Sequence, residues 1–260
     1  TGVQTCALPI LFDRISRKLY LTENGRRALQ YARHIIDLLD EMEQGVRDVD
    51  AMGRLKVGTS ITIGTYLLPG YIKKLKQQYP ALKVEASIAN SGTIEQQILD
   101  NDIDVGIIEG VAHSPFILSE SFAGDRLVFI CPAGHEFAGK TLEELSEVRN
   151  QDFILREKGS AGREIFDGIL AAQELNVRPI WQSASNQVIL QGVKAGLGIS
   201  ILPYFLVRQD IREGELAEFR IKDLALNRKY SVIYHKNKFL PRSARTLMEL
   251  CKEGNGADRL

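Results

Sequence analysis

The stretch RLKVGTSITIGTYLLPGYIKKLKQQYPALKVEASIANSGTIEQQILDNDIDVGIIEG, residues 54–110, determines the fold of this chain. Short apolar runs alternate in it with longer segments of helical periodicity. The predicted strands and helices lie at 55–59, 66–78, 84–88, 93–100 and 105–108. Strand–helix–strand connections of this length impose parallel pairing with right-handed crossovers. We therefore expect an α/β unit whose parallel sheet carries helices on both faces.

A second alternating series of strands and helices follows in residues 127–202, so two similar α/β units share the chain. The last predicted strand, 230–234, precedes a helix at 243–251 that could return to the first unit. If it does, the chain crosses between the units twice and the crossings form a hinge. The cleft between two such lobes is then the expected ligand site.

Composition restricts the function classes. With 44% apolar and 25% charged residues among 260, the chain has the profile of a soluble globular protein. Lys plus Arg (33) balances Asp plus Glu (33), so nucleic-acid binding would need a local basic patch. No apolar run is long enough for a membrane span, and we expect no membrane partner. The three widely spaced cysteines, Cys6, Cys131 and Cys251, favour a reducing cytoplasm.

A long helix is predicted from Thr22, a typical N-cap residue, to about Asp50. Its apolar residues are spaced by four and three in alternation, which is an a/d heptad seam. The seam residues are Ala28, Ala32, Ile35, Leu39, Met42, Val46 and Val49. A core helix of the same domain is the alternative, but the length of about 40 Å favours dimerisation.

The region before this seam is basic, and Arg14, Arg17 and Lys18 could contact the DNA backbone. A merely solvated basic face is the alternative interpretation.

Polar residues follow the predicted strands, where ligands bind in open α/β sheets because helix N-termini present unpaired N–H groups. From the first unit we expect Ser60 and Thr62 at the site, with Thr93 from a second turn. From the second unit we expect Ser160 and Arg163, whose guanidinium would supply positive charge. Secondary candidates are Thr59, Ser91 and Asn186. Helix capping is the competing explanation for the Ser, Thr and Asn residues.

No catalytic residues, metal site or cofactor are predicted. The segment Cys131-Pro-Ala-Gly-His135 places a thiol near an imidazole, but Cys131 ends an apolar strand, which favours a buried thiol. Gly196-Leu197-Gly198 precedes a strand, the wrong order for a dinucleotide-binding turn. An enzyme on this scaffold, such as a porphyrin-pathway deaminase with a reactive Cys131, is disfavoured.

The chain resembles a LysR-type transcriptional regulator that lacks its first part. Residues 11–14 and 19–25 resemble the wing and linker-helix start of that family's winged helix-turn-helix. Further matches are Gly53-Arg54-Leu55-Lys56-Val57-Gly58, Leu68-Pro69, Asp104-Val105-Gly106-Ile107 and the run from Val193 to Pro203. Their order and spacing, across residues 11–253, make the resemblance specific.

The resemblance implies a cytoplasmic homodimer or tetramer that binds DNA under the control of a small effector. The implied fold is α/β: a long N-terminal linker helix, then a two-subdomain, periplasmic-binding-protein-like (type 2) effector domain. We expect a non-native segment (1–10), a winged helix-turn-helix remnant (11–21), a linker helix (22–52), subdomain I (53–124 and 235–253), subdomain II (125–234) and a tail (254–260).

Both helices of the helix-turn-helix should precede residue 11, so we expect this chain to retain dimerisation and effector binding without the recognition helix. The intact parent would bind DNA, and the effector would be a small carboxylate or oxyanion. A free-standing solute-binding protein of the same two-lobed fold is the alternative function.

Overall fold

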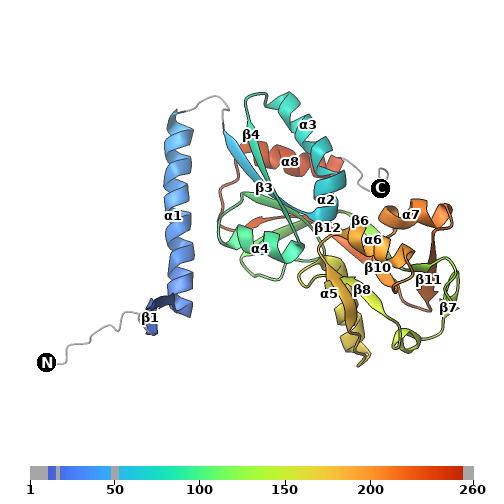
Figure 1. Ribbon diagram of the computed structural model, residues 1–260. Helices are drawn as coiled ribbons and strands as arrows, with labels where there is room; N and C mark the ends of the chain where they lie inside the picture. Colours follow the sequence, from blue (N-terminus) through green and yellow to red (C-terminus); the bar gives the residue numbers. More distant parts are fainter. Residues whose placement is uncertain (1–10, 16–17, 48–52, 254–260) are drawn as a thin grey trace.

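The computed structural model describes residues 11–15, 18–47 and 53–253 (Figure 1). The expected non-native segment 1–10 and the tail 254–260 lie outside these residues. A two-lobed α/β body carries a long helix at its side, joined through residues 48–52. Within the described ranges, no helix has the combination of length and apolarity needed to cross a bilayer.

The N-terminal part is a hairpin followed by the long helix. Strand β1 (Phe12–Ile15) pairs antiparallel with β2 (Lys18–Leu21), and α1 spans Glu23–Arg47. The Thr22 hydroxyl accepts a hydrogen bond from the Gly25 amide at 2.9 Å, which confirms Thr22 as the N-cap. A Cβ at Gly25 would collide with the Leu11 carbonyl, so only glycine fits this turn against the hairpin.

Lobe I contains the parallel strands of the opening stretch. Its strands are β3 (Arg54–Ser60), β4 (Lys83–Ala89) and β5 (Val105–Glu109), in the order β4-β3-β5. Its helices are α2 (Ile61–Tyr66), α3 (Leu68–Gln78), α4 (Ser91–Leu99) and α8 (Arg242–Glu253). The predicted parallel pairing is confirmed, with Thr59 opposite both Ile88 and Ile107. The return of α8 is also confirmed, because Leu247 is fully buried in the same core cluster as Leu75 of α3.

The helix expected at 66–78 is present as α3, which begins at Leu68, but the short helix α2 before it was not expected. The chain forms α2 first, and α3 begins only after Leu67. Pro69 lies in the first turn of α3, where its missing N–H costs no helical hydrogen bond. The break leaves α2 as a short helix directly after β3, so its first residues lie at the carboxyl edge of the sheet.

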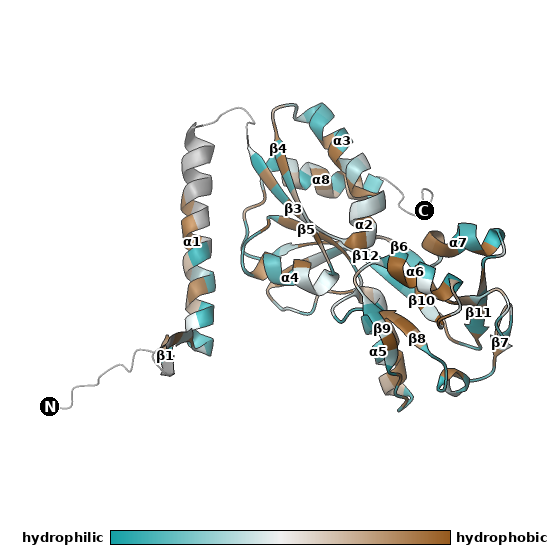
Figure 2. Cartoon of the chain, in the orientation of Figure 1, coloured by the Kyte–Doolittle hydropathy of each residue, from teal (hydrophilic) through white to brown (hydrophobic). Residues whose placement is uncertain are grey.

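Lobe II contains the second α/β unit. Its strands are β7 (Thr141–Leu142), β8 (Phe153–Arg156), β9 (Pro179–Ser183), β10 (Ser200–Pro203) and β11 (Leu216–Ile221). Its helices are a 3-10 turn (Leu145–Val148), α5 (Ala161–Ala172), α6 (Asn186–Lys194) and α7 (Tyr204–Arg212). Figure 2 shows hydrophobic residues along β8, whereas the coloured part of α1, nearest β1, alternates between hydrophilic and hydrophobic residues.

Two long antiparallel strands connect the lobes. They are β6 (Ile117–Pro132) and β12 (Asn227–His235), which pair along β12 with a bulge between Tyr230 and Ser231. The first half of β6 pairs in lobe I and the second half pairs with β10 and β11 of lobe II. Because β12 joins the core of lobe I from Tyr230 onward, we propose lobe boundaries near 124 in β6 and near 229 in β12.

Candidate functional site

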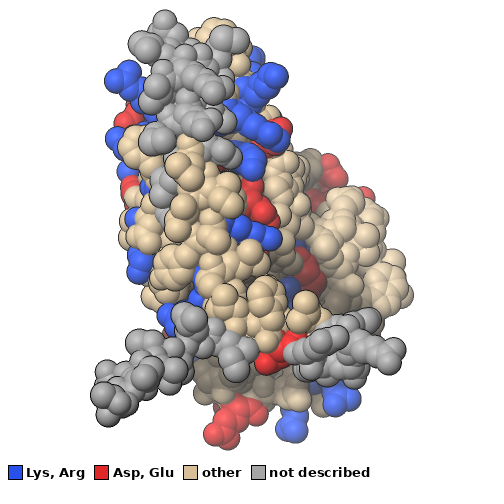
Figure 3. All heavy atoms as spheres, turned by 90° about the vertical axis from the view of Figure 1, so that its left-hand side faces the viewer, with Lys and Arg blue, Asp and Glu red and all other residues tan. Residues whose placement is uncertain are grey.

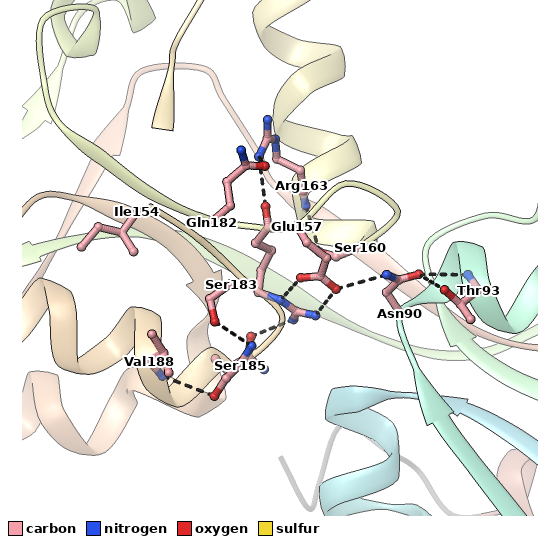
Figure 4. A network of polar contacts seen from close by, with 12 residues as sticks. Asn90, Thr93, Ile154, Glu157, Ser160, Arg163, Gln182, Ser183, Ser185 and Val188 are labelled. Carbon is pink, nitrogen blue, oxygen red and sulfur yellow. Dashed lines mark hydrogen bonds and ion pairs between the residues drawn. The ribbon is translucent and has the colours of Figure 1, made fainter. Parts of the chain in front are cut away.

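The carboxyl ends of the lobe I strands face the first turns of the lobe II helices (Figure 1). We call this region the lobe interface, and define it by the turns 59–62, 90–93, 109–110, 157–163 and 183–187. Its helix starts are ordered by side-chain caps: Asn90 Oδ1 accepts from the Thr93 amide at 2.9 Å, and Ser160 Oγ accepts from the Arg163 amide at 3.4 Å. Figure 4 shows these polar residues converging from both lobes.

Ser60 and Thr62 are the predicted site residues with unused hydrogen-bonding capacity. Each side chain is 2% exposed. Neither hydroxyl has a hydrogen-bonding partner within the described part of the chain. Ser60 occupies the N-cap position of α2 but makes no capping bond. A buried hydroxyl without a partner costs about 1–3 kcal/mol, so capping does not explain this pair.

The other predicted hydroxyls of lobe I are already bonded. Thr59 is fully buried and donates to the Ser60 carbonyl at 3.2 Å. Ser91 donates to the Glu109 carbonyl at 2.9 Å. Thr93 is exposed, and its hydroxyl donates to Asn90 Oδ1 at 2.9 Å. These three side chains stabilise the turns 59–62, 90–93 and 109–110 of the lobe interface.

In lobe II the predicted residues also serve local structure. Ser160 is the N-cap of α5, and Asn186 Oδ1 accepts from Arg156 Nη1 at 2.8 Å. The remaining donors of Arg156 bond the Glu157 carboxylate at 2.9 and 3.1 Å. Ser160 and Asn186 thus lie at the lobe interface, but each has a partner.

Arg163 was expected to supply the positive charge for an effector. In the structure it is 7% exposed and pairs through Nε with Asp167, one helical turn further on, at 2.7 Å. Its Nη1 donates to the Arg156 carbonyl at 3.0 Å and to Gln182 at 3.3 Å. Figure 4 shows the guanidinium near Gln182, away from Asn90. Here Arg163 joins α5 to β8 and β9 within lobe II.

Contacts across the lobe interface were missed by sequence reasoning. Asn90 Nδ2 donates to Glu157 Oε1 at 3.3 Å, and the Gly92 amide donates to the Gly159 carbonyl at 3.0 Å. Gly159 has φ +87°, and a Cβ there would approach Asn90 Oδ1 to 3.1 Å. Two glycines therefore allow the backbones of the lobes to meet. The sequence placed Thr93 and Ser160 at the expected site, but gave no signal that the backbones of their two turns touch.

Two further pairs join the lobes. His113 of lobe I contacts Glu164 of α5 at 2.6 Å, and the rings of Tyr66 and Phe205 meet edge to face at 5.1 Å. These contacts hold the two lobes against each other in the structure.

A buried ionic cluster was also missed. Arg228 of β12 binds both oxygens of Asp125 in β6 at 2.6 and 2.7 Å, and contacts Glu109 Oε2 at 3.1 Å. Burial alone would lower the pKa of Arg228, but the charges of Glu109 and Asp125 outweigh it and raise that pKa. Because 103 residues separate Asp125 from Arg228, no sequence spacing predicts the pair.

The cysteines of the described region are structural thiols. Burial raises the pKa of Cys131 to about 11 and that of Cys251 to about 12. Cys131 donates weakly to the Ala217 carbonyl at 3.6 Å. Since thiolates are the reactive form, burial argues against a nucleophilic Cys131.

We expect a thiol reagent at pH 8 to label Cys131 and Cys251 at least about 100-fold more slowly in the folded chain than in urea. Peptide mapping by mass spectrometry distinguishes both from Cys6, which lies outside the described residues. Rapid labelling of Cys131 in the folded chain would contradict the structural role.

The predicted dimerisation and DNA residues lie in the N-terminal part. Ile35 and Leu39 are 58% and 52% exposed. Ala28 is half-buried and Ala32 is exposed, Met42 and Val46 belong to α1, and Val49 lies outside the described residues. Arg14 is in β1 and Lys18 in β2, whereas Arg17 lies outside the described residues. In Figure 3, uncharged side chains run along the middle of the face that carries α1, with Lys and Arg beside them.

A pocket separates α1 from lobe I. On α1 its lining residues are Glu23, Arg27, Gln30 and Tyr31, none of which belongs to the seam. None of the described seam residues Ala28, Ala32, Ile35 and Leu39 lines this pocket.

Comparison with known proteins gives consistent matches. The family model of the LysR substrate binding domain matches residues 50–256. The "Uncharacterized HTH-type transcriptional regulator YeiE" of Escherichia coli (strain K12) is 34% identical, over 94% of this chain and 83% of that protein. The "HTH-type transcriptional regulator CysL" of Bacillus subtilis is 28% identical, over 86% of this chain and 70% of that protein.

Solved structures agree with the fold. The regulatory domain of Synechocystis PCC6803 CcmR, in complex with 2-PG, superposes with a TM-score of 0.70 at 24% identity, covering 78% of this chain and 98% of that one. The cofactor-binding domain of the Cbl transcriptional regulator gives a TM-score of 0.67 at 20% identity, covering 81% and 92%. At these identities the likeness establishes the two-lobed fold.

Proposed function

Because the chain belongs to the LysR family of transcriptional regulators, we propose that a small carboxylate or oxyanion, bound at the lobe interface, controls its activity. The chain contains the effector-binding domain of such a regulator, which lobes I and II form. Family membership also places it among transcription regulators rather than enzymes. It favours the regulator over the alternative of a free-standing solute-binding protein.

The buried, unpartnered hydroxyls of Ser60 and Thr62 are the observation that carries this proposal. They lie at the carboxyl ends of the lobe I strands, where open α/β sheets bind ligands. An effector that hydrogen-bonds both would remove a desolvation cost of about 1–3 kcal/mol for each group. The CcmR domain, which has the same fold, was solved in complex with 2-PG. This likeness supports a small-molecule effector for the effector domain of this chain.

We propose that the effector acts by favouring the closed arrangement of the lobes. The contacts that join the lobes include three polar pairs, Asn90–Glu157, Gly92–Gly159 and His113–Glu164, and the aromatic pair Tyr66–Phe205. Exposed ion pairs contribute about 0–1 kcal/mol, so a ligand that bridges the lobes could shift the balance. The β6 and β12 strands, which alone among the described strands span both lobes, are the hinge of this motion.

We propose further that α1 holds two copies of the chain together, and that dimers or tetramers act on DNA in the cytoplasm. Arg14, Arg17 and Lys18 are the proposed contacts to DNA phosphates. Within the described residues no helix precedes β1. We therefore assign sequence readout to a segment other than the described residues, since a recognition helix would have to enter the major groove.

The double variant Ser60→Ala/Thr62→Val tests the effector site. We expect it to weaken binding of small acids about 10- to 100-fold, because two hydrogen bonds of about 0.5–1.5 kcal/mol each are lost. The measurement is calorimetric titration of the full chain with phosphate, sulfate, glycolate and acetate.

Thr65→Val is the matched control, since Thr65 is exposed on the same helix and bonds only the Ile61 carbonyl. It should bind like the wild-type chain. Equal affinities of the double variant and the wild-type chain would contradict the proposed site. Failure of all four acids to bind the wild-type chain would contradict a small acid as effector.

A further inference from the structure

The buried ionic cluster has one more carboxylate than it has guanidinium groups. Arg228 and its partners Asp125 and Glu109 all have side chains less than one-tenth exposed. Asp125 accepts hydrogen bonds from Nε and Nη2 of Arg228. Glu109 contacts the third nitrogen, Nη1, through Oε2 only. Two carboxylates thus share one cation in a buried environment, where unbalanced charge is costly. Glu109 is the member of the cluster that retains hydrogen-bonding capacity.

The position of Glu109 places it beside the proposed effector site. It is the last residue of β5, two residues beyond Ile107, which pairs with Thr59 near the carboxyl end of β3. Its carbonyl accepts from Ser91. The next residue, Gly110, lies against Ala161 of lobe II, whose Cβ would be 2.9 Å from a Cβ at Gly110. Glu109 therefore lies where the turns of both lobes meet.

Glu109 Oε1 is buried, and it has no hydrogen-bonding partner among the residues the structure describes. The neighbouring Tyr230 hydroxyl is in the same condition. Burial, followed by the charge of Asp125, raises the pKa of Tyr230, which keeps it a neutral phenol. With Ser60 and Thr62, these groups offer hydroxyls together with one strong acceptor.

The arginines at and beside the lobe interface are already paired, whereas Lys158, in the turn 157–163, is exposed. Arg156 bonds Glu157 and Asn186, Arg163 bonds Asp167, and Arg228 bonds Asp125 and Glu109. A fully deprotonated anion would meet the Glu109 carboxylate without a free guanidinium opposite it. An anion that carries its own O–H could donate to Glu109 and accept from Ser60 and Thr62.

We propose that Glu109 determines effector specificity, and that the effector is a small anion with its own hydrogen-bond donor, such as hydrogen phosphate or a 2-hydroxy carboxylate. This inference rests on the proposed function and narrows its ligand class. A donor-bearing anion satisfies Glu109 Oε1, whereas an anion without a donor leaves it unpaired and adds repulsion between like charges. Glu109 would therefore distinguish two anions of nearly equal size when only one of them carries a hydrogen-bond donor.

Matched pairs of probes test the inference: phosphate against sulfate, and glycolate against acetate. We expect the wild-type chain to bind the donor-bearing member of each pair at least about tenfold more tightly, since the other member leaves a buried acceptor unpaired. Glu109→Gln keeps the shape and an oxygen for Arg228, but replaces the second acceptor by an amide donor. We expect this variant to reduce both preferences to about threefold or less.

Asp125→Asn is the control for a purely structural role, since it also removes one charge from the Arg228 cluster. Thermal unfolding without ligand reports structural damage in either variant. The inference predicts that only Glu109→Gln changes the phosphate-to-sulfate ratio. An unchanged ratio in Glu109→Gln, or an equal change in Asp125→Asn, would overturn it.

The same titrations separate this inference from the proposed function. If the wild-type chain does not prefer donor-bearing anions, yet Ser60→Ala/Thr62→Val still weakens binding, the role of Glu109 is overturned and the effector site stands. If none of the four anions binds the wild-type chain, both fail.

Discussion

Replacing Arg228 by Met should destabilise the chain by about 3–5 kcal/mol, because the change leaves two buried carboxylates without their cation. The Arg228 side chain is 3% exposed, and those of Asp125 and Glu109 are 9% and 5% exposed, so water does not solvate the abandoned charges. The cluster joins β5, β6 and β12 where the chain crosses between the lobes. We therefore expect the loss to affect the whole effector domain.

Urea unfolding followed by circular dichroism measures this effect. Arg126→Met is the matched control, since Arg126 is also an arginine near the crossing but its side chain is 41% exposed where it pairs with Glu218. Its loss should cost about 1 kcal/mol or less. Adding Asp125→Asn and Glu109→Gln to Arg228→Met should recover much of the lost stability, since no buried charge then lacks a partner. Equal, small losses at Arg228 and Arg126 would mean that the cluster is solvated.

The region around this cluster also shows which parts of the fold the sequence alone does not predict. The strands β3, β4 and β5 were predictable because each is a local run with turn residues at its ends. The hinge half of β6, SESFAGDR at 119–126, is polar and contains a glycine, so it does not read as a strand. The strand β11 and helix α7 were likewise not anticipated. This segment of β6 is a strand because it pairs with β12, which is far away in the sequence. Local sequence patterns do not predict such a pairing.

The candidate site was predictable in position but only partly in chemistry. Strand ends followed by Ser60 and Thr62 are local signals, and the structure buries both hydroxyls there. Arg163 shows the limit: its partner Asp167 is visible at i+4, but its contact with the Arg156 carbonyl depends on how α5 packs on β8. Glu109 follows the predicted strand 105–108 and so falls at the expected site, but its burial and its pairing with Arg228 depend on the neighbouring strand β12 and are not visible in the sequence.

The second large effect that we expect is dissociation of the dimer, and it follows from the apolar seam of α1. The described residues of this seam have no partner within this chain. Ile35 and Leu39 are more than half exposed, and they lie one turn apart in the heptad series that began with Ala28. A row of exposed apolar side chains on a 25-residue helix is stable when a second helix covers it. The pocket between α1 and lobe I is lined by other residues, which leaves the seam open to a second copy of the chain.

Leu39→Asp should therefore convert the dimer into monomers, raising the dissociation constant by about 100-fold or more, because each dimer would bury two unpaired carboxylates in the seam. Light scattering across a concentration series measures the dissociation constant, and circular dichroism confirms that the effector domain remains folded. Gln30→Asp introduces the same charge on the α1 face toward lobe I and should leave the dimer intact. A dimer that survives Leu39→Asp would move self-association to the effector domains, and lobe closure would then have to be transmitted without α1.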